Sequence, residues 1–306
     1  MSTGRAPQLL SGVGRRQRRG FTWRQGDIVG LQDDGQHLVV PGPGAPVASG
    51  TVWLDESRLQ QHLQAFSFSE KDVGMARPVS YQFADGVATI TMDDGKVNAL
   101  SLSMLAAVNE ALDQALDDAA IVILAGRPGI FSGGFDLKVL GGGGADAGQL
   151  LDDGFLLALR LLEHPFPVVI ACTGHAIAMG SFLLMSADYR IGIEGPYRLV
   201  ANEVAIGLTM PQAAIEICRQ RLTPADFQRA VMLAETYTPS GGVAAGFLDR
   251  VVGEADLMQE ATLLAQHFAT LDPHAHAATK ALARTASVGA IRTGLEADRV
   301  IFRQLG

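Results

Sequence analysis

Two glycine-rich stretches punctuate the chain, FSGGFDLK at residues 131–138 and TGHAIAMG at residues 173–180. Each follows a short apolar run and leads into a stretch with helical spacing. A turn from a strand into a helix leaves backbone N–H groups unpaired at the helix start, where they attract negative charge. Two such turns side by side predict an oxyanion hole, in which two N–H groups hold one developing oxygen anion.

Length and composition narrow the class of protein. The 306 residues, 48% of them hydrophobic, suffice for one large domain with an appendage or for two domains. No apolar run approaches the roughly 20 residues that cross a bilayer, so we expect a cytoplasmic protein without a membrane partner. The net charge of -8 argues against nucleic acid as a partner. Cys172 and Cys218 lack metal-ligand spacing, so we expect two buried thiols and no metal site.

The first 76 residues differ from the rest. Six arginines and no acidic residue precede Asp27, and the turn-rich run PGPGAP follows at residues 41–46. A transit peptide, a basic interaction arm and a poorly ordered extension all fit this pattern, and we favour the last. Met75 lies just before the point where regular hydrophobic patterning begins. A start codon assigned too far upstream would therefore explain the unusual composition of the residues before it. Residues 54–68 have some helical spacing.

From residue 79 the patterning predicts an α/β fold with a helical C-terminal region. Strand-like runs alternate with helical spacing, and Asp85-Gly86 reads as the turn of a hairpin. A flexible segment is expected around residues 141–144, where four glycines follow one another. The expected strands are 79–83, 87–92, 121–125, 167–172 and 189–193, and the expected helices are 103–116, 149–163, 180–187, 213–221, 224–233, 257–271 and 276–302.

Residues 79–300 resemble the crotonase, or enoyl-CoA hydratase/isomerase, superfamily. Five motifs in the right order carry the resemblance: NALS at 98–101, the first glycine stretch with its DLK, TGHA at 173–176, ADYR at 187–190, and AGFLDRVV at 245–252. The resemblance implies a spiral of ββα turns and a helical region that assembles homotrimers, often paired into hexamers. We therefore divide the chain into an N-terminal extension (1–76), a spiral core (77–232) and a helical C-terminal region (233–306).

The resemblance also implies an acyl-CoA thioester as substrate, with CoA as part of the substrate and no separate cofactor. By position, the backbone N–H groups of Gly133 and Met179 would hold the thioester oxygen. Gly134 would allow close approach of the chain, and Asp136 would cap the following helix. The segment containing Lys96, Val97 and Ala99 would lie near the adenine, and Phe135 would contact the substrate. Met179 replaces a more usual glycine, which requires a backbone conformation open to a side chain.

The candidate base distinguishes reactions within the family. In the family that this chain resembles, hydratases use two glutamates. At the equivalent positions this chain has Phe182 and Glu203, so only the second residue is acidic. One glutamate is enough to move a proton from C2 to C4 of a 3-enoyl-CoA, and an apolar wall at Phe182 would exclude water. The sequence is most similar in this respect to 3-enoyl to 2-enoyl-CoA isomerases.

Other interpretations of these residues stay open. Glu203 could form a surface salt bridge, and Phe182 could be a core aromatic. Ser132 does not fit a nucleophile motif, and His175 is expected to be structural. An enoyl-CoA hydratase of fatty-acid oxidation and a non-catalytic acyl-CoA-binding protein of the same fold are the alternative functions.

Overall fold

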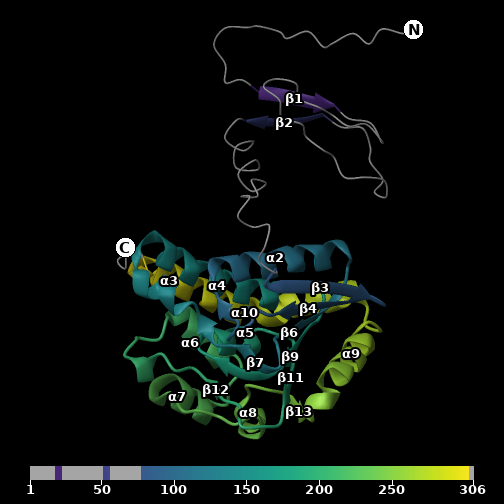
Figure 1. The fold of residues 1–306 in the computed structure, drawn as a ribbon. Coiled ribbons are helices and arrows are strands. Elements are labelled where there is room, and N and C mark those ends of the chain that lie inside the picture. The colour runs from purple at the N-terminus through teal and green to yellow at the C-terminus, as the bar shows by residue number, and fades with distance from the viewer. Residues whose placement is uncertain (1–17, 23–50, 56–76, 303–306) are drawn as a thin grey trace, which may run out of the picture. The chain divides into compact units, whose positions relative to one another are not determined.

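The computed structural model describes residues 18–22, 51–55 and 77–302, which fall in two units, 1–75 and 76–306. In the first unit, β1 (Arg18–Thr22) pairs antiparallel with β2 (Thr51–Asp55). The expectation of a disordered head and most of the helical spacing at residues 54–68 lie outside the described residues. The second unit carries the α/β fold (Figure 1).

A six-stranded sheet forms the centre of the second unit, with the strand order β13-β11-β9-β6-β4-β3. Only β3 (Val79–Ala84) and β4 (Val87–Met92) pair antiparallel, and the remaining neighbours are parallel. The predicted hairpin is confirmed, since Asp85 and Gly86 adopt the positive φ values of 51° and 78° that a tight turn needs. The other strands are β6 (Ile121–Ala125), β9 (Val168–Cys172), β11 (Tyr189–Ile193) and β13 (Arg250–Val252).

A smaller parallel sheet contains β12 (Leu199–Val200), β10 (Gly174–Ile177) and β7 (Gly129–Ser132), in that order. The two-residue strands β5 (Ala99–Leu100) and β8 (Gly134–Phe135) form a further parallel pair. The glycine stretches are therefore not simple loops after β6 and β9. Each contains strand residues of a second sheet, which the chain enters after leaving the central one.

Helix α2 (Leu102–Asp117) begins where the Ser101 side chain accepts the Met104 N–H at 3.1 Å. The expectation of a flexible segment at residues 141–144 is wrong. Helix α3 (Leu137–Gly142) continues through two of these glycines, α4 (Gly144–Glu163) begins at the last, and only Gly143 lies between them. Helix α4 begins five residues before the expected start, and Ala147 within these added residues is buried in the core, so tertiary packing stabilises the extra turn.

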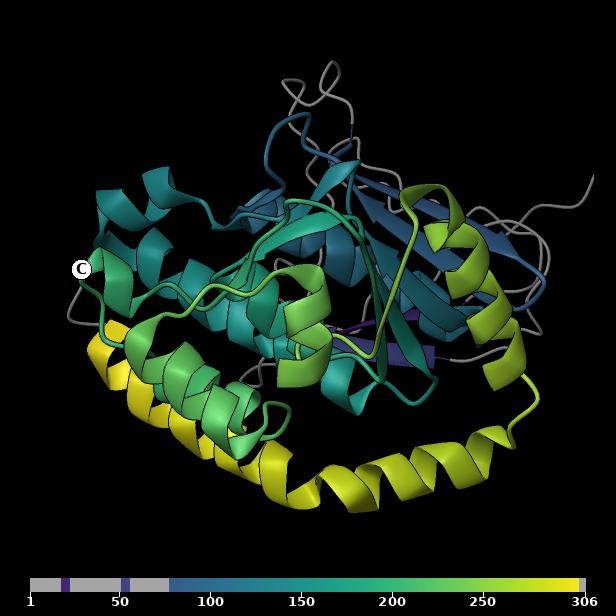
Figure 2. The same cartoon turned by 90° about the horizontal axis from the view of Figure 1, so that it is seen from below.

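The helical C-terminal region is confirmed, with most helix ends within three residues of those expected. Its long last helix, α10 (Pro273–Phe302), packs against α4 and α6 and runs along the outside of the unit (Figure 2). No helix of the described residues is both long and apolar enough to cross a bilayer. The other helices are α5 (Met179–Met185), α6 (Gln212–Arg219), α7 (Pro224–Leu233), α8 (Pro239–Ala245) and α9 (Leu257–Phe268), with short 3₁₀ turns η2 (Val204–Ile206) and η3 (Glu254–Asp256).

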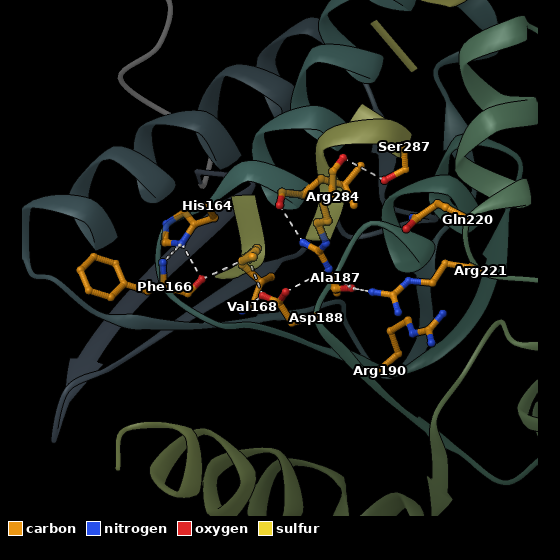
Figure 3. A network of polar contacts seen from close by, with 12 residues as sticks. His164, Phe166, Val168, Ala187, Asp188, Arg190, Gln220, Arg221, Arg284 and Ser287 are labelled. Atoms are coloured by element: carbon orange, nitrogen blue, oxygen red, sulfur yellow. Dashed lines mark hydrogen bonds and ion pairs between the residues drawn. The ribbon is translucent and has the colours of Figure 1, made fainter. Parts of the chain in front are cut away.

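A network of charged groups attaches the first half of α10 to the core (Figure 3). The Asp188 carboxylate pairs with Lys280 Nζ at 2.6 Å and with Arg284 Nη2 at 3.0 Å. Arg284 also donates to the carbonyls of Leu162 at the end of α4 and Ala187 just after α5. Positive charge is favourable at the C-terminal ends of helices, so Arg284 stabilises the end of α4 while it helps to hold α10 in place.

Candidate active site

Three parallel strands of the small sheet end at one edge, and each is followed by a predicted site segment. Ala176 of β10 lies opposite Ser132 of β7, and Ile177 lies opposite Val200 of β12. Parallel strands place their carboxyl ends on the same side of a sheet, where open α/β folds bind ligands. Residues 133–135, 178–179 and 201–203 therefore come together at this edge.

The two glycine stretches touch each other at Gly134. This residue has φ of +90°, and a Cβ atom there would lie 2.9 Å from the Ile177 carbonyl oxygen and 3.5 Å from the Met179 nitrogen. No side chain fits in that space without displacing the second stretch. Gly134 therefore provides the close approach expected of it from the sequence.

Met179 is accommodated without backbone strain. It is the first residue of α5, and the positive φ falls on the preceding Ala178, at 49°. The Met179 side chain is fully buried, with its Cγ close to Gly154 of α4. No acceptor among the described residues pairs with its N–H, which lies at a helix N-terminus and is free to bind an anion.

The structure contradicts the assignment of Gly133 as the other oxyanion donor. Its N–H already donates to the Val97 carbonyl at 2.8 Å. The N–H of Asp136 donates to the Leu100 carbonyl of β5 at 3.2 Å, and the N–H groups of successive residues in a strand point to opposite edges. The N–H of Phe135 consequently points away from β5, so Phe135 takes the place of Gly133 as the first candidate donor.

The Phe135 ring fills the place of a missing side chain on α4. A Cβ atom at Gly154 would overlap this ring, and the ring meets Phe155 edge to face with centroids 6.4 Å apart. Phe155 in turn stacks on Phe182 at 6.3 Å. Because Phe182 is only 1% exposed, its interpretation as a core aromatic is confirmed, and its position offers no carboxylate for catalysis.

Glu203 is a buried carboxyl group at the edge where the three strands end. It lies three residues beyond β12, at the start of η2, and is 8% exposed. Its Oε2 is buried and has no hydrogen-bond partner among the described residues, as is true of Oδ1 of the neighbouring Asn202. Burial raises the pKa of Glu203 to about 7, opposed by a smaller effect of its own backbone N–H. No ion pair holds it within the described part of the chain, which contradicts the surface salt-bridge interpretation.

A carboxylate organises the segment predicted to lie near CoA. The Asp94 side chain accepts the N–H groups of Lys96, Asn98 and Ala99 at 2.7, 2.8 and 3.0 Å. Burial alone would raise the pKa of Asp94, but these three N–H groups outweigh burial and lower it. Val97 stands 52% exposed on this segment, so its side chain is available for contact.

Sequence reasoning missed Asp94 and Arg127 because no motif marks either of them. Arg127 Nη1 donates to the Lys96 carbonyl at 2.8 Å, and its Nε lies 3.2 Å from the Asp93 carboxylate. It thereby ties the 93–99 segment to the turn before β7. The tendency of an aspartate to accept the N–H group two residues on, as Asp94 does from Lys96, is the one local signal that could have indicated this arrangement.

Three smaller predictions concern side chains on or next to these strands. Asp136 caps α3 as expected, accepting the Lys138 N–H at 2.8 Å. Ser132 is fully buried and donates to the Asn98 carbonyl at 2.8 Å, so its hydroxyl is structural. His175 accepts the backbone N–H of residue 198 at 3.0 Å, which agrees with a structural role.

Known proteins are similar to this chain in both sequence and fold. The model of the enoyl-CoA hydratase/isomerase family matches residues 82–306. Human mitochondrial enoyl-CoA delta isomerase 1 is 28% identical over 218 residues, covering 70% of this chain and 72% of that protein. A structure of an enoyl-CoA hydratase from Mycobacterium marinum is 47% identical with a TM-score of 0.71, covering 74% of this chain and 99% of that one. An enoyl-CoA isomerase from Mycobacterium tuberculosis is 48% identical with a TM-score of 0.70, covering 72% and 97%. With its spiral α/β core and helical C-terminal region, the chain belongs to the enoyl-CoA hydratase/isomerase family of the crotonase superfamily.

Proposed function

We propose that the protein converts 3-enoyl-CoA to 2-enoyl-CoA by a 1,3-proton shift. The Glu203 carboxylate takes a proton from C2 and returns it at C4, while the double bond moves into conjugation with the thioester. The observation that carries the proposal is a buried carboxyl oxygen that has no hydrogen-bond partner within the described ranges, at the strand edge that presents two backbone N–H groups. One group thus serves as base and then as acid.

The N–H groups of Phe135 and Met179 stabilise the intermediate. Proton removal next to a thioester carbonyl leaves a dienolate, whose negative charge gathers on the thioester oxygen. Losing one donor of such an oxyanion hole typically costs ~3–4 kcal/mol in the barrier. Because Met179 is the first residue of α5, the positive end of the helix dipole also stabilises this negative charge.

The raised pKa of Glu203 suits a group that both accepts and returns a proton. At a pKa of about 7, the carboxylate and the acid are similarly populated near neutral pH. A carboxylate of ordinary pKa would be a weaker base toward the acidic C–H bond next to the thioester. The burial of Glu203 therefore matches its proposed role.

The buried Phe182 favours isomerisation over hydration. Adding water across a double bond requires a group to orient and deprotonate it, and the hydratase pattern uses two carboxylates for this task. Phe182 supplies an aromatic ring sealed in the core. Because a similar solved structure is named an enoyl-CoA hydratase, that reaction is the second candidate.

We also propose how the rest of the substrate binds. The 93–99 segment, which contains Lys96, Val97 and Ala99, would contact the CoA end, and Gly134 and Asp136 would shape the path toward the thioester. No separate cofactor takes part, because CoA belongs to the substrate. A homotrimer or a hexamer would be the working assembly.

Incubating the full chain with 3-hexenoyl-CoA and, separately, with 2-hexenoyl-CoA tests the proposal. We expect rapid conjugation of the first substrate and little hydration of the second. Glu203→Gln should abolish conjugation, and Glu254→Gln, a change on exposed η3, should leave it intact. Hydration at a rate comparable with isomerisation would refute the choice of reaction, and tight CoA binding without turnover would favour the non-catalytic protein.

A further inference from the structure

A buried carboxylate on α10 caps the helix that follows the Glu203 segment. Asp298 is 1% exposed, and its two oxygens accept the N–H groups of Gln212 and Ala213, each at 2.9 Å. We propose that Asp298 is a positioning residue for Glu203 and acts through the N-terminus of α6. This inference rests on the proposed function of Glu203 as the acid and base.

Helix α6 depends on this distant cap because it has none of its own. Its N-cap residue is Pro211, which provides no side-chain hydrogen bond. The first N–H groups of a helix lack intrahelical partners, and a carboxylate both satisfies them and complements the helix dipole. Bonds from N–H groups to an ionised carboxylate are stronger than neutral ones. Asp298 therefore determines where α6 begins, from 86 residues further along the chain.

Helices α6 and α10 pack closely against each other near Asp298. One turn before Asp298, a Cβ atom at Gly294 would lie 2.9 Å from both the Ala213 nitrogen and the Gln212 carbonyl carbon. Ile291 and Leu295 on α10 are buried as well. This contact leaves α6 little freedom to shift along α10.

The segment that carries Glu203 is held at both ends. At its start, the Val200 carbonyl accepts the Ala178 N–H at 2.9 Å, which joins it to the second glycine stretch. At its end stands the first turn of α6. Between these anchors the Glu203 carbonyl accepts the N–H groups of Ile206 and Leu208, and residues 204–208 are exposed, with η2 in contact with α7 on one side. The position of Glu203 relative to the Met179 N–H thus depends on both anchors.

Loosening the first turn of α6 should displace the Glu203 carboxylate without disturbing CoA binding. A displacement of about 1 Å at a reacting group can lower the rate about 100-fold. The 93–99 segment belongs to another part of the unit, held by Asp94 and Arg127. We therefore expect a lower kcat with little change in KM.

Asp298→Asn is the first test, with Glu296→Gln as the control. Asparagine keeps the shape but turns one acceptor into a donor that faces an N–H group. Glu296 lies on the same helix, its side chain is 70% exposed, and its carboxylate forms an ion pair only with Arg299 among the described residues. With 3-hexenoyl-CoA, we expect Asp298→Asn to lower kcat at least about 30-fold and to change KM less than threefold. The control should match the wild type.

A second variant removes a donor and leaves Asp298 in place. Gln212→Pro puts proline at the first helical position, where its fixed φ suits the helix and its missing N–H breaks one bond to Asp298. Pro211 has the extended conformation, ψ 144°, that a residue before proline prefers. We expect the same fall in kcat, with a thermal midpoint within about 2 °C of the wild type. Gln212→Pro therefore decides the matter if Asp298→Asn does not fold.

Hydrogen exchange makes the inference testable apart from catalysis. Amides of residues 203–208 should exchange at least about tenfold faster in both variants, whereas those of β6 in the central sheet should be unchanged. Unchanged exchange and kcat in both variants would overturn the inference, as would faster exchange throughout the unit with kcat following the folded fraction. If the wild type fails to isomerise any 3-enoyl-CoA, the proposed function fails, and the exchange result still decides the role of Asp298.

Discussion

Replacing Glu203 by glutamine should stabilise the protein at alkaline pH while it removes the activity. Burial raises the pKa of Glu203 from 4.5 to about 7, so ionisation is less favourable in the folded chain than in the unfolded one. The proton bound by Glu203 thus stabilises the folded state fully below pH 4.5, and this stability is lost as the pH rises through 7. At about 1.36 kcal/mol per pKa unit, the wild type loses about 3.4 kcal/mol across this window.

Glutamine carries no charge and avoids this loss. The free energy of unfolding of Glu203→Gln relative to the wild type should therefore rise by about 2.5 kcal/mol between pH 5 and pH 8.5. For a unit of this size, that difference corresponds to about 5–10 °C in the unfolding midpoint. Urea unfolding of both proteins at several pH values measures the difference, with Glu254→Gln as the exposed control. A difference that stays constant from pH 5 to pH 8.5 would show that Glu203 ionises as an ordinary surface carboxyl group.

Three further substitutions, and a control for the last of them, test other parts of the site and the fold. Gly134→Ala should lower kcat about 100-fold or more in steady-state assays, because its Cβ would lie 2.9 Å from the Ile177 oxygen and separate the two N–H donors; wild-type kcat would refute the close contact. Phe182→Glu should cost at least about 3 kcal/mol in urea unfolding and gain no hydration of 2-hexenoyl-CoA, because the carboxyl group would enter the core; a stable, active hydratase would contradict this. Asp188→Asn should cost about 3–5 kcal/mol by leaving buried Lys280 without its partner, whereas Asp113→Asn, at an exposed ion pair, should cost less than about 1 kcal/mol.

Features set by local chemistry could be predicted from the sequence. The hairpin at Asp85-Gly86 follows from turn residues between two strand-like runs, and α7 begins and ends where Pro224 and Leu233 were expected. The sequence also predicted that the two glycine stretches act together, because each follows a short apolar run and precedes a stretch with helical spacing. Such signals depend on residues within a few positions of one another, so an isolated sequence contains them.

Features set by pairing between distant segments could not be predicted. The strands β5, β8 and β12 have two residues each, too few for any periodicity to show. The choice between Gly133 and Phe135 as donor turns on one hydrogen bond to Val97, formed across 36 positions in the chain. Local sequence likewise does not predict that Asp298 caps α6, because the two helices meet only in the folded chain. In each case the deciding partner is remote in sequence.

The close packing of the Phe135 ring against Gly154 has a consequence for engineering the candidate active site. The Phe135 ring occupies the volume that any side chain at residue 154 would need. A library that varies residue 154 alone would displace the ring and, with it, the N–H group that we propose as an oxyanion donor. Conversely, a smaller residue at 135 would open a void beside α4 that a larger residue at 154 could fill. The two positions, on different elements, should therefore be randomised together, and active combinations should show reciprocal sizes.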